Sequence, residues 1–108
     1  IKFVDILLVN EIEAQQISND YSNSFDRIAK KLSKKISKVI ITLGSKGVIA
    51  CEENGTPIHI KGHHVDVKSA HGAGDYFAAK FLLEFLKNNI FENAISVANK
   101  KTAEFISA

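Results

Sequence analysis

The chain has 108 residues, 45% of them hydrophobic and 24% charged, which suits one small globular domain and excludes a disordered or fibrous class. Its 14 basic and 12 acidic residues leave a net charge of only +2, with scattered lysines, so we expect no nucleic acid and no membrane as a partner. Cys51 is the only cysteine, which excludes an internal disulfide and suits a reducing, cytoplasmic compartment.

The first half of the chain has the pattern of a parallel crossover unit. Residues 3–9 are rich in Val, Ile and Leu and predict a strand buried on both faces, too short to cross a bilayer. Asn10 ends this strand and opens a short helix over residues 11–18. Apolar residues at helical spacing predict a second helix over residues 25–36, whose lysines we expect to form a solvated face. A β-branched run over residues 39–43 follows, so the order strand, helix, strand predicts the α/β class.

The second half changes from this crossover pattern to short strands and then to helices. Apolar runs at residues 48–51, 58–60 and 65–67 predict antiparallel strands at a sheet edge, with Cys51 as a buried strand residue. The apolar run over residues 76–86 favours a buried helix, and a last helix is predicted for the remaining residues from about 92 to 106. There is no internal repeat or linker, so we interpret the chain as one domain or subdomain.

The segment His71-Gly72-Ala73-Gly74-Asp75 lies between an extended stretch and the long apolar helix. Small residues at a helix start let the backbone approach an anion, and unpaired N–H groups with the helix dipole would hold a phosphate. A carboxylate in the first helical turn can take a proton from an attacking hydroxyl. Taken alone, the same pattern also fits a tight turn in which Asp75 only complements the helix dipole.

Two further segments carry polar residues and glycines where strands are predicted to end. Asn10 and Glu13 have a spacing that by itself fits a helix cap with a capping box. Thr42-Leu43-Gly44-Ser45-Lys46-Gly47 by itself fits an ordinary strand-turn-strand connection. Neither segment alone identifies a function.

Together these segments resemble the ribokinase-like (PfkB) family of carbohydrate kinases. Residues 69–77, SAHGAGDYF, are similar to the family signature D-T-T-G-A-G-D-x-F. Asn10 and Glu13 match its N-x-x-E motif, and residues 42–47 match T-x-G-x-x-G, in the family's order. The resemblance implies a Rossmann-like, partly parallel sheet with packed helices. It identifies residues 1–108 as the C-terminal nucleotide-binding and catalytic part, and thus as an incomplete part of the family fold.

The resemblance also implies an activity, which is transfer of the γ-phosphoryl group of ATP to a hydroxyl of a sugar or related small molecule. It implies that Asp75 is the catalytic base and that the N–H groups of Gly72, Ala73 and Gly74 form the anion hole. It assigns Mg²⁺ to Glu13. The residues that it assigns to the nucleotide are Asn10, Thr42, Gly44, Ser45, Gly47 and Asn99.

The chain departs from the family pattern at several positions. Ser69, Ala70 and His71 stand where the family usually has Asp-Thr-Thr. In many members that aspartate is associated with a monovalent cation, so the resemblance lends no support to potassium activation here. Lys80 replaces a usually small residue, and we expect its charged end to extend towards solvent.

Family members are considerably longer and carry sugar-contacting residues in an N-terminal half that has no counterpart in this sequence. The substrate therefore cannot be deduced, and we expect this segment alone to be inactive. Its unpaired surfaces should be covered by the missing N-terminal half or by self-association. Two alternatives stay open, namely a non-catalytic nucleotide-binding fragment or regulatory module, and a nucleoside or vitamin-precursor kinase of the same fold.

Overall fold

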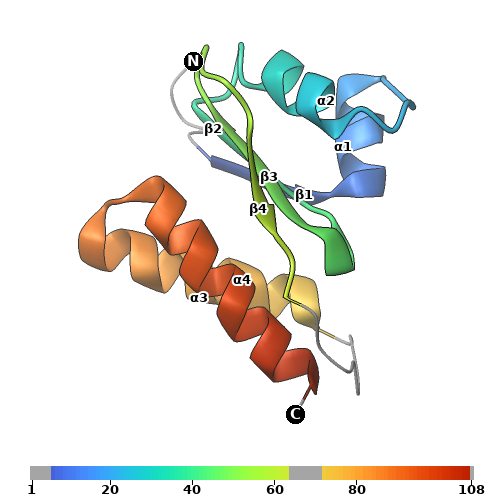
Figure 1. Cartoon of the computed structure of the whole chain (residues 1–108). Coiled ribbons are helices and arrows are strands. Elements are labelled where there is room, and N and C mark those ends of the chain that lie inside the picture. Colours follow the sequence, from blue (N-terminus) through green and yellow to red (C-terminus); the bar gives the residue numbers. More distant parts are fainter. Residues whose placement is uncertain (1–5, 64–71, 108) are drawn as a thin grey trace. The chain divides into compact units, whose positions relative to one another are not determined.

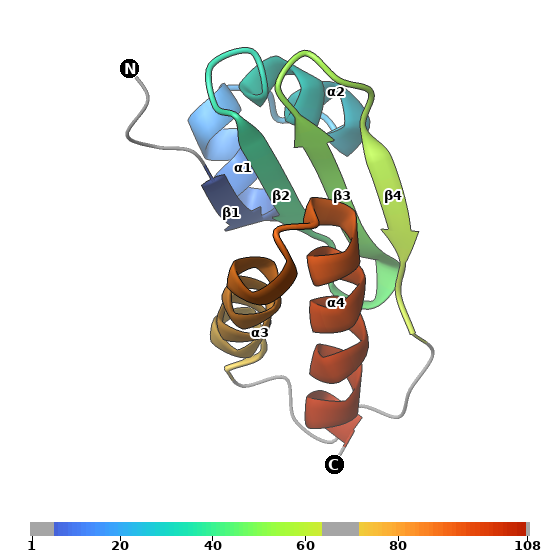
Figure 2. The same ribbon diagram turned by 90° about the vertical axis from the view of Figure 1, so that its left-hand side faces the viewer.

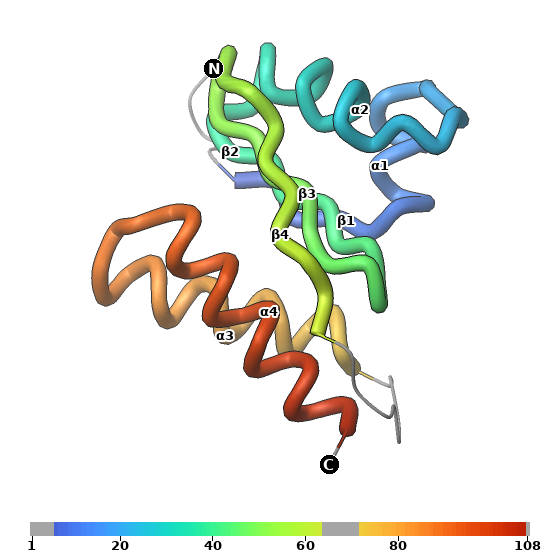
Figure 3. The backbone as a smooth tube through the Cα atoms, in the orientation of Figure 1, coloured from blue at the N-terminus to red at the C-terminus, as the bar shows by residue number. Residues whose placement is uncertain are grey.

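The computed structural model describes residues 6–63 and 72–107, whose elements are labelled in Figure 1 and traced as a tube in Figure 3. In chain order the elements are β1 (Ile6–Asn10), α1 (Glu11–Ser18), α2 (Phe25–Leu32), β2 (Lys38–Thr42), the 3₁₀ turn η1 (Gly44–Lys46), β3 (Gly47–Glu52), β4 (Ile58–Lys61), α3 (Ala73–Asn88) and α4 (Phe91–Ser107). They divide into two compact units. One holds the described residues up to Leu43 together with Val48–Ile60, and the other holds Gly44–Gly47 and the described residues from Lys61 onward.

The four strands form one sheet in the order β1-β2-β3-β4, and they lie side by side in Figure 2. β1 and β2 are parallel, with Asn10 opposite Thr42. β2 and β3 are antiparallel, with Ile41 opposite Ile49. The predicted crossover pairing and the antiparallel strand after it are therefore confirmed, whereas the strand predicted over residues 65–67 lies outside the described residues.

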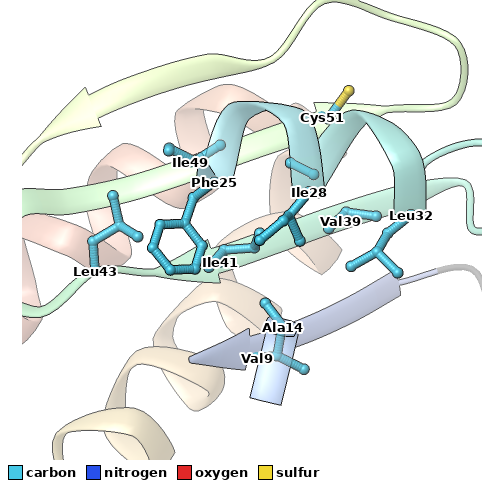
Figure 4. Close-up of a cluster of buried hydrophobic side chains, with 11 residues drawn as sticks. Val9, Ala14, Phe25, Ile28, Leu32, Val39, Ile41, Leu43, Ile49 and Cys51 are labelled. Carbon is cyan, nitrogen blue, oxygen red and sulfur yellow. The ribbon is translucent and has the colours of Figure 1, made fainter. Parts of the chain in front are cut away.

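A single apolar cluster joins α1 and α2 to the sheet (Figure 4). Its buried residues are Val9, Ala14, Phe25, Ile28, Ala29, Leu32, Val39, Ile41, Leu43, Ile49 and Cys51. Val39 and Ile41 reach it together because alternate residues of a strand share one face. The α2 residues reach it because their spacing places them on one helical stripe. Cys51 is buried, as predicted, with only 1% of its surface exposed.

Helix α2 ends at Leu32, four residues before the predicted end. Ser33 is its C-cap, and the Ser33 hydroxyl donates a hydrogen bond of 2.7 Å to the carbonyl of Lys30. Such a local side-chain bond competes with the regular helix ladder. Ile36 still packs against the core from the turn that follows, which is why it fits the apolar pattern without being helical.

The two lysines of α2 are exposed, as predicted, and both also bond to neighbouring elements. Lys31 Nζ donates a 2.7 Å hydrogen bond to the carbonyl of Ser18, the last residue of α1. Lys30 Nζ donates a 2.9 Å bond to the carbonyl of Gly55 in the turn after β3. A cation at the C-terminal end of a helix also offsets the helix dipole, so Lys31 stabilises the packing of α1 against α2.

The turn between α1 and α2 is organised by Asp20. Asp20 Oδ1 accepts a hydrogen bond of 3.1 Å from the backbone N–H of Ser22, and the Arg27 guanidinium donates to both carboxylate oxygens at 3.0 Å. The bonds from Ser22, followed by those from Arg27, lower the pKa of Asp20 below its ordinary value. These bonds favour the charged form of the carboxyl group.

We expect Asp20→Asn to lower the melting temperature at about pH 6, and to lower it progressively less as pH falls below about 4. The folded-state pKa is depressed, so the stabilisation is present above the unfolded-state pKa of about 3.9 and is lost as pH falls through the folded-state pKa. Thermal unfolding followed by circular dichroism measures the difference, with Asp26→Asn on α2 as the control. The same loss for both variants at about pH 6 would contradict this role of Asp20.

Helices α3 and α4 pack side by side and are joined by a short turn (Figure 3). Asn89 ends α3 in the left-handed conformation with φ 56°, and its N–H donates to the carbonyl of Phe85 at 2.7 Å. Near this turn the rings of Phe81 and Phe85 stack at 5.5 Å, and Phe91 meets them edge-on at 6.0 and 6.3 Å. No helix in the described part of the chain is both long enough and apolar enough to span a membrane.

Two predicted burial patterns are wrong. Helix α3 was expected to be buried, but Leu82, Leu83 and Leu86 are 48%, 64% and 81% exposed. Strand β1 was expected to be buried on both faces, but Ile6–Leu8 are only half-buried, because β1 pairs with β2 alone among the described strands. Exposed leucines and a free strand edge are surfaces that a larger assembly normally covers.

Candidate active site

Asn10 and Glu13 meet at the carboxyl end of β1, where they cap α1. Asn10 Oδ1 accepts a 2.8 Å hydrogen bond from the N–H of Glu13, and Glu13 Oε1 accepts a 3.0 Å bond from the N–H of Asn10. The structure thus shows the capping box that the spacing allowed. Both side chains are exposed, and a carboxylate has about four acceptor positions, so this bond leaves Glu13 able to bind water or a cation.

Thr42 lies beside this cap at the end of the neighbouring strand. It stands opposite Asn10 in the parallel register, and its hydroxyl donates a hydrogen bond of 3.4 Å to the carbonyl of Val9. In open α/β sheets, ligands bind just beyond the carboxyl ends of parallel strands. Asn10, Glu13 and Thr42 therefore occupy the edge where such a ligand would be held.

The turn Gly44–Gly47 depends on glycine at three places. Gly44 and Gly47 have φ of 62° and 100°, which L-residues rarely adopt. Gly62 packs its backbone against the same turn, since a Cβ at this position would lie 2.0 Å from the carbonyl oxygen of Ser45. Sequence reasoning missed Gly62, although an isolated glycine directly after a strand is a known sign of close backbone approach.

The start of α3 presents open backbone donors beside a carboxylate. Gly72 is the N-cap with φ 78°, and no described side chain caps the helix. The first hydrogen bond of the helix runs from the N–H of Tyr76 to the carbonyl of Gly72 at 2.9 Å, which leaves the N–H groups of Ala73, Gly74 and Asp75 without helical acceptors. Open N–H groups at the positive end of a helix dipole are the arrangement that binds anions in other proteins, and Asp75 is exposed in the same turn.

Small residues keep this helix start accessible. A Cβ added at Gly72 or at Gly74 would meet no described atom within 4 Å. No described atom therefore obstructs the backbone at these two glycines, while the phosphoryl-binding role assigned to residues 72–74 stays a prediction. The preceding residues Ser69, Ala70 and His71 lie outside the described residues, and so does the prediction about the monovalent cation.

Asn99 holds the strand end that leads to Gly62. It is buried in α4, and its Nδ2 donates a 2.7 Å hydrogen bond to the carbonyl of Lys61, the last residue of β4. The bond fixes the chain one residue before the close approach of Gly62 to Ser45. In the described contacts Asn99 therefore supports the turn, while its direct contact with a nucleotide stays a prediction.

The donor set suits magnesium held mainly by phosphates and water. Among residues 6–63 and 72–107, no three His, Cys, Asp or Glu side chains converge as a protein metal cage requires. Mg²⁺ usually binds to one or two carboxylates together with substrate phosphates and several waters. Glu13 offers one such exposed carboxylate, so the residues present fit this kind of site.

Known proteins support this reading of the fold. A model of the pfkB family of carbohydrate kinases matches residues 1–107, while a search of the curated proteins found no match. The ribokinase of Thermotoga maritima is 26% identical with a TM-score of 0.84, over 99% of this chain and 37% of that chain. Aminoimidazole riboside kinase of Salmonella enterica, complexed with aminoimidazole riboside and an ATP analogue, is 26% identical with a TM-score of 0.78, over 96% and 36%.

The ribokinase of Arabidopsis thaliana complexed with ribose and ATP shows the same fold, with 24% identity and a TM-score of 0.87 over 99% of this chain and 36% of that chain. The chain thus spans about a third of the length of these solved kinases. The predicted ribokinase-like fold is confirmed, as an incomplete part of the whole. Since the family model matches residues 1–107, the chain belongs to the pfkB family of carbohydrate kinases.

Proposed function

We propose that this chain supplies the nucleotide-binding and catalytic part of a kinase that phosphorylates a hydroxyl group of a sugar or a nucleoside with ATP. The observation that carries the proposal is the start of α3, where the open N–H groups of Ala73, Gly74 and Asp75 adjoin the exposed carboxylate of Asp75. Phosphoryl transfer needs mainly positioning and charge stabilisation. One helix end supplies both a base and an anion site.

In the proposed reaction the acceptor hydroxyl oxygen attacks the γ-phosphorus of ATP. The bond from that phosphorus to the bridging oxygen breaks, and ADP leaves with the bonding electrons. Asp75 takes the proton of the hydroxyl as the new bond forms. The N–H groups of Gly72, Ala73 and Gly74 donate to the phosphoryl oxygens, where the helix dipole adds to their effect.

We assign the rest of the nucleotide to Asn10, Thr42, Gly44, Ser45, Gly47 and Asn99. The turn Gly44–Gly47 would accept phosphates through backbone N–H groups, which only close backbone approach allows. Magnesium, bound near Glu13, would neutralise phosphate charge. Support for ATP comes from the ribokinase and riboside kinase structures that contain ATP or its analogue.

The names of the relatives support the proposed acceptor class. They are ribokinases and an aminoimidazole riboside kinase, so a sugar or a nucleoside is the expected substrate. A vitamin precursor finds no support among these names. The presence of Asp75 beside an open anion site argues against a non-catalytic nucleotide-binding module, because such a module needs no base. A cytoplasmic location stays a prediction.

The test is release of ADP from ATP by the active polypeptide that contains this chain, with a panel of free sugars and nucleosides. We expect acceptor-dependent release with one member of the panel and a requirement for magnesium. ADP release that is the same with and without every acceptor would point to a nucleotide-binding protein with incidental hydrolysis. Tight ATP binding without any release would favour the non-catalytic module.

We further propose that a polypeptide equivalent to the remaining two-thirds of the relatives covers the exposed leucines of α3 in the active enzyme. Without it, the 108-residue chain should self-associate through this apolar stripe, with Leu83 64% and Leu86 81% exposed. We expect Leu83→Gln with Leu86→Gln to weaken the association roughly tenfold in sedimentation equilibrium. Lys87→Gln is the adjacent exposed control, and a monomer at all concentrations would contradict the prediction.

A further inference from the structure

The first turn of α3 has few interactions of its own that would keep it helical. No described side chain caps it, and its N-terminal amides have no helical acceptors. Gly72 and Gly74 add backbone freedom, because glycine loses more conformational entropy on ordering than any other residue. A helix end with these properties frays unless a contact from elsewhere restrains it.

Tyr76 provides such a contact, with a residue of the other helix. Its ring stacks on the ring of Phe105 in α4, with centroids 4.2 Å apart and planes at 8°. Lys80 Nζ lies 5.4 Å from the centroid of the same ring, in reach of a cation–π interaction. Tyr76 directly follows Asp75, and its N–H makes the first hydrogen bond of the helix. Fixing its ring therefore fixes the rotation of the turn that carries Asp75.

The far end of the same helix pair is held independently. There the rings of Phe81, Phe85 and Phe91 contact one another at 5.5 to 6.3 Å. This cluster secures the packing of α3 on α4 near Asn89 without touching the first turn. Of the ring–ring contacts within the described part of α3 and α4, the stack on Phe105 is the one that reaches the residue next to Asp75.

We propose that Phe105 is a positioning residue for phosphoryl transfer, acting through Tyr76 to orient Asp75 and the open amides of residues 72–74. The proposal deepens the proposed function and rests on it. Phe105 is 42% exposed, so it contributes modestly to the buried core. It restrains a helix end whose geometry is important for the proposed phosphoryl transfer. Misplacing a reacting group by about 1 Å can cost roughly a hundredfold in rate, so a weak contact at this place has a large effect.

The first test is hydrogen exchange of the Tyr76 amide in the 108-residue chain. Phe105→Ala should speed this exchange roughly tenfold, because an aromatic pair restrains a helix end by about that factor. Phe105→Tyr keeps the stack and should restore the wild-type rate. Phe91→Leu removes ring contacts at the far end and should change it less than about twofold. Unchanged exchange in Phe105→Ala, or an equal change in Phe91→Leu, overturns the proposal.

The second test is turnover of the active polypeptide. Phe105→Ala should lower kcat roughly tenfold with little change in KM for ATP, and Phe105→Tyr should recover it. Added to Asp75→Asn, Phe105→Ala should cause a smaller loss than it causes in the wild type, because part of its effect acts through Asp75. Additive losses overturn the positioning role. If the wild type phosphorylates nothing, the proposed function fails, while the exchange rates still decide whether Phe105 restrains the turn.

Discussion

Asp75→Asn is expected to reduce kcat of the active polypeptide by at least about a hundredfold, the low end of what general-base catalysis contributes. Asparagine keeps the size and polarity of the side chain but cannot accept the proton of the acceptor hydroxyl. The affinity for ATP should stay close to that of the wild type, since the open backbone amides at the start of α3 are unchanged.

A structural role for Asp75 predicts a different result. A carboxylate that only complements the helix dipole is worth at most about 1 kcal/mol of folding stability at an exposed site and nothing in turnover. Glu92→Gln in the first turn of α4 is the matched control, because it also removes an exposed negative charge from a helix start. Turnover, ATP affinity and melting temperature measured on both variants separate the roles. Equal, near-normal turnover of the two would eliminate Asp75 as the base.

Gly62→Ala is expected to destabilise the fold by about 2 to 3 kcal/mol and to weaken ATP binding roughly tenfold. The added Cβ would lie 2.0 Å from the carbonyl oxygen of Ser45 and 2.9 Å from the N–H nitrogen of Gly47. These are backbone atoms, so the turn that we assign to the phosphates must move. Urea unfolding and titration with ATP measure the two effects.

Gly74→Ala is the control for the urea unfolding of Gly62→Ala. It makes the same chemical change where a Cβ meets no described atom within 4 Å, inside a helix that alanine favours. Its stability should equal or exceed that of the wild type. A Gly62→Ala variant as stable as the wild type would show that the turn and residue 62 do not approach so closely.

The crossover unit could be predicted because its signals are local. An apolar run, a capping residue and an amphipathic helix each specify one element, and their order specifies a parallel pair. The capping box of Asn10 and Glu13 follows from spacing alone. The end of α2 was misplaced because the hydroxyl of Ser33 bonds back to Lys30, a choice that the apolar pattern up to Ile36 does not reveal.

The features that were missed depend on contacts between distant parts of the chain. The turn requires glycine at position 62 because the backbone there lies close to Ser45, and Tyr76 is held by its stack on Phe105. No periodicity in the sequence links these positions. The exposure of Leu86 could not be predicted either, because the apolar run over residues 76–86 does not reveal which of its residues pack against α4. The roles proposed for the site residues come from the resemblance to the family.

The most direct measurement of the central claim follows the γ-phosphoryl group itself. ATP labelled with ³²P at the γ-position is incubated with the active polypeptide and its acceptor, for the wild type and for Asp75→Asn in parallel. We predict that the wild type places the label on the acceptor hydroxyl and that the variant does so at most at about one-hundredth of that rate. Label released only as inorganic phosphate, or transferred equally fast by Asp75→Asn, would contradict the account.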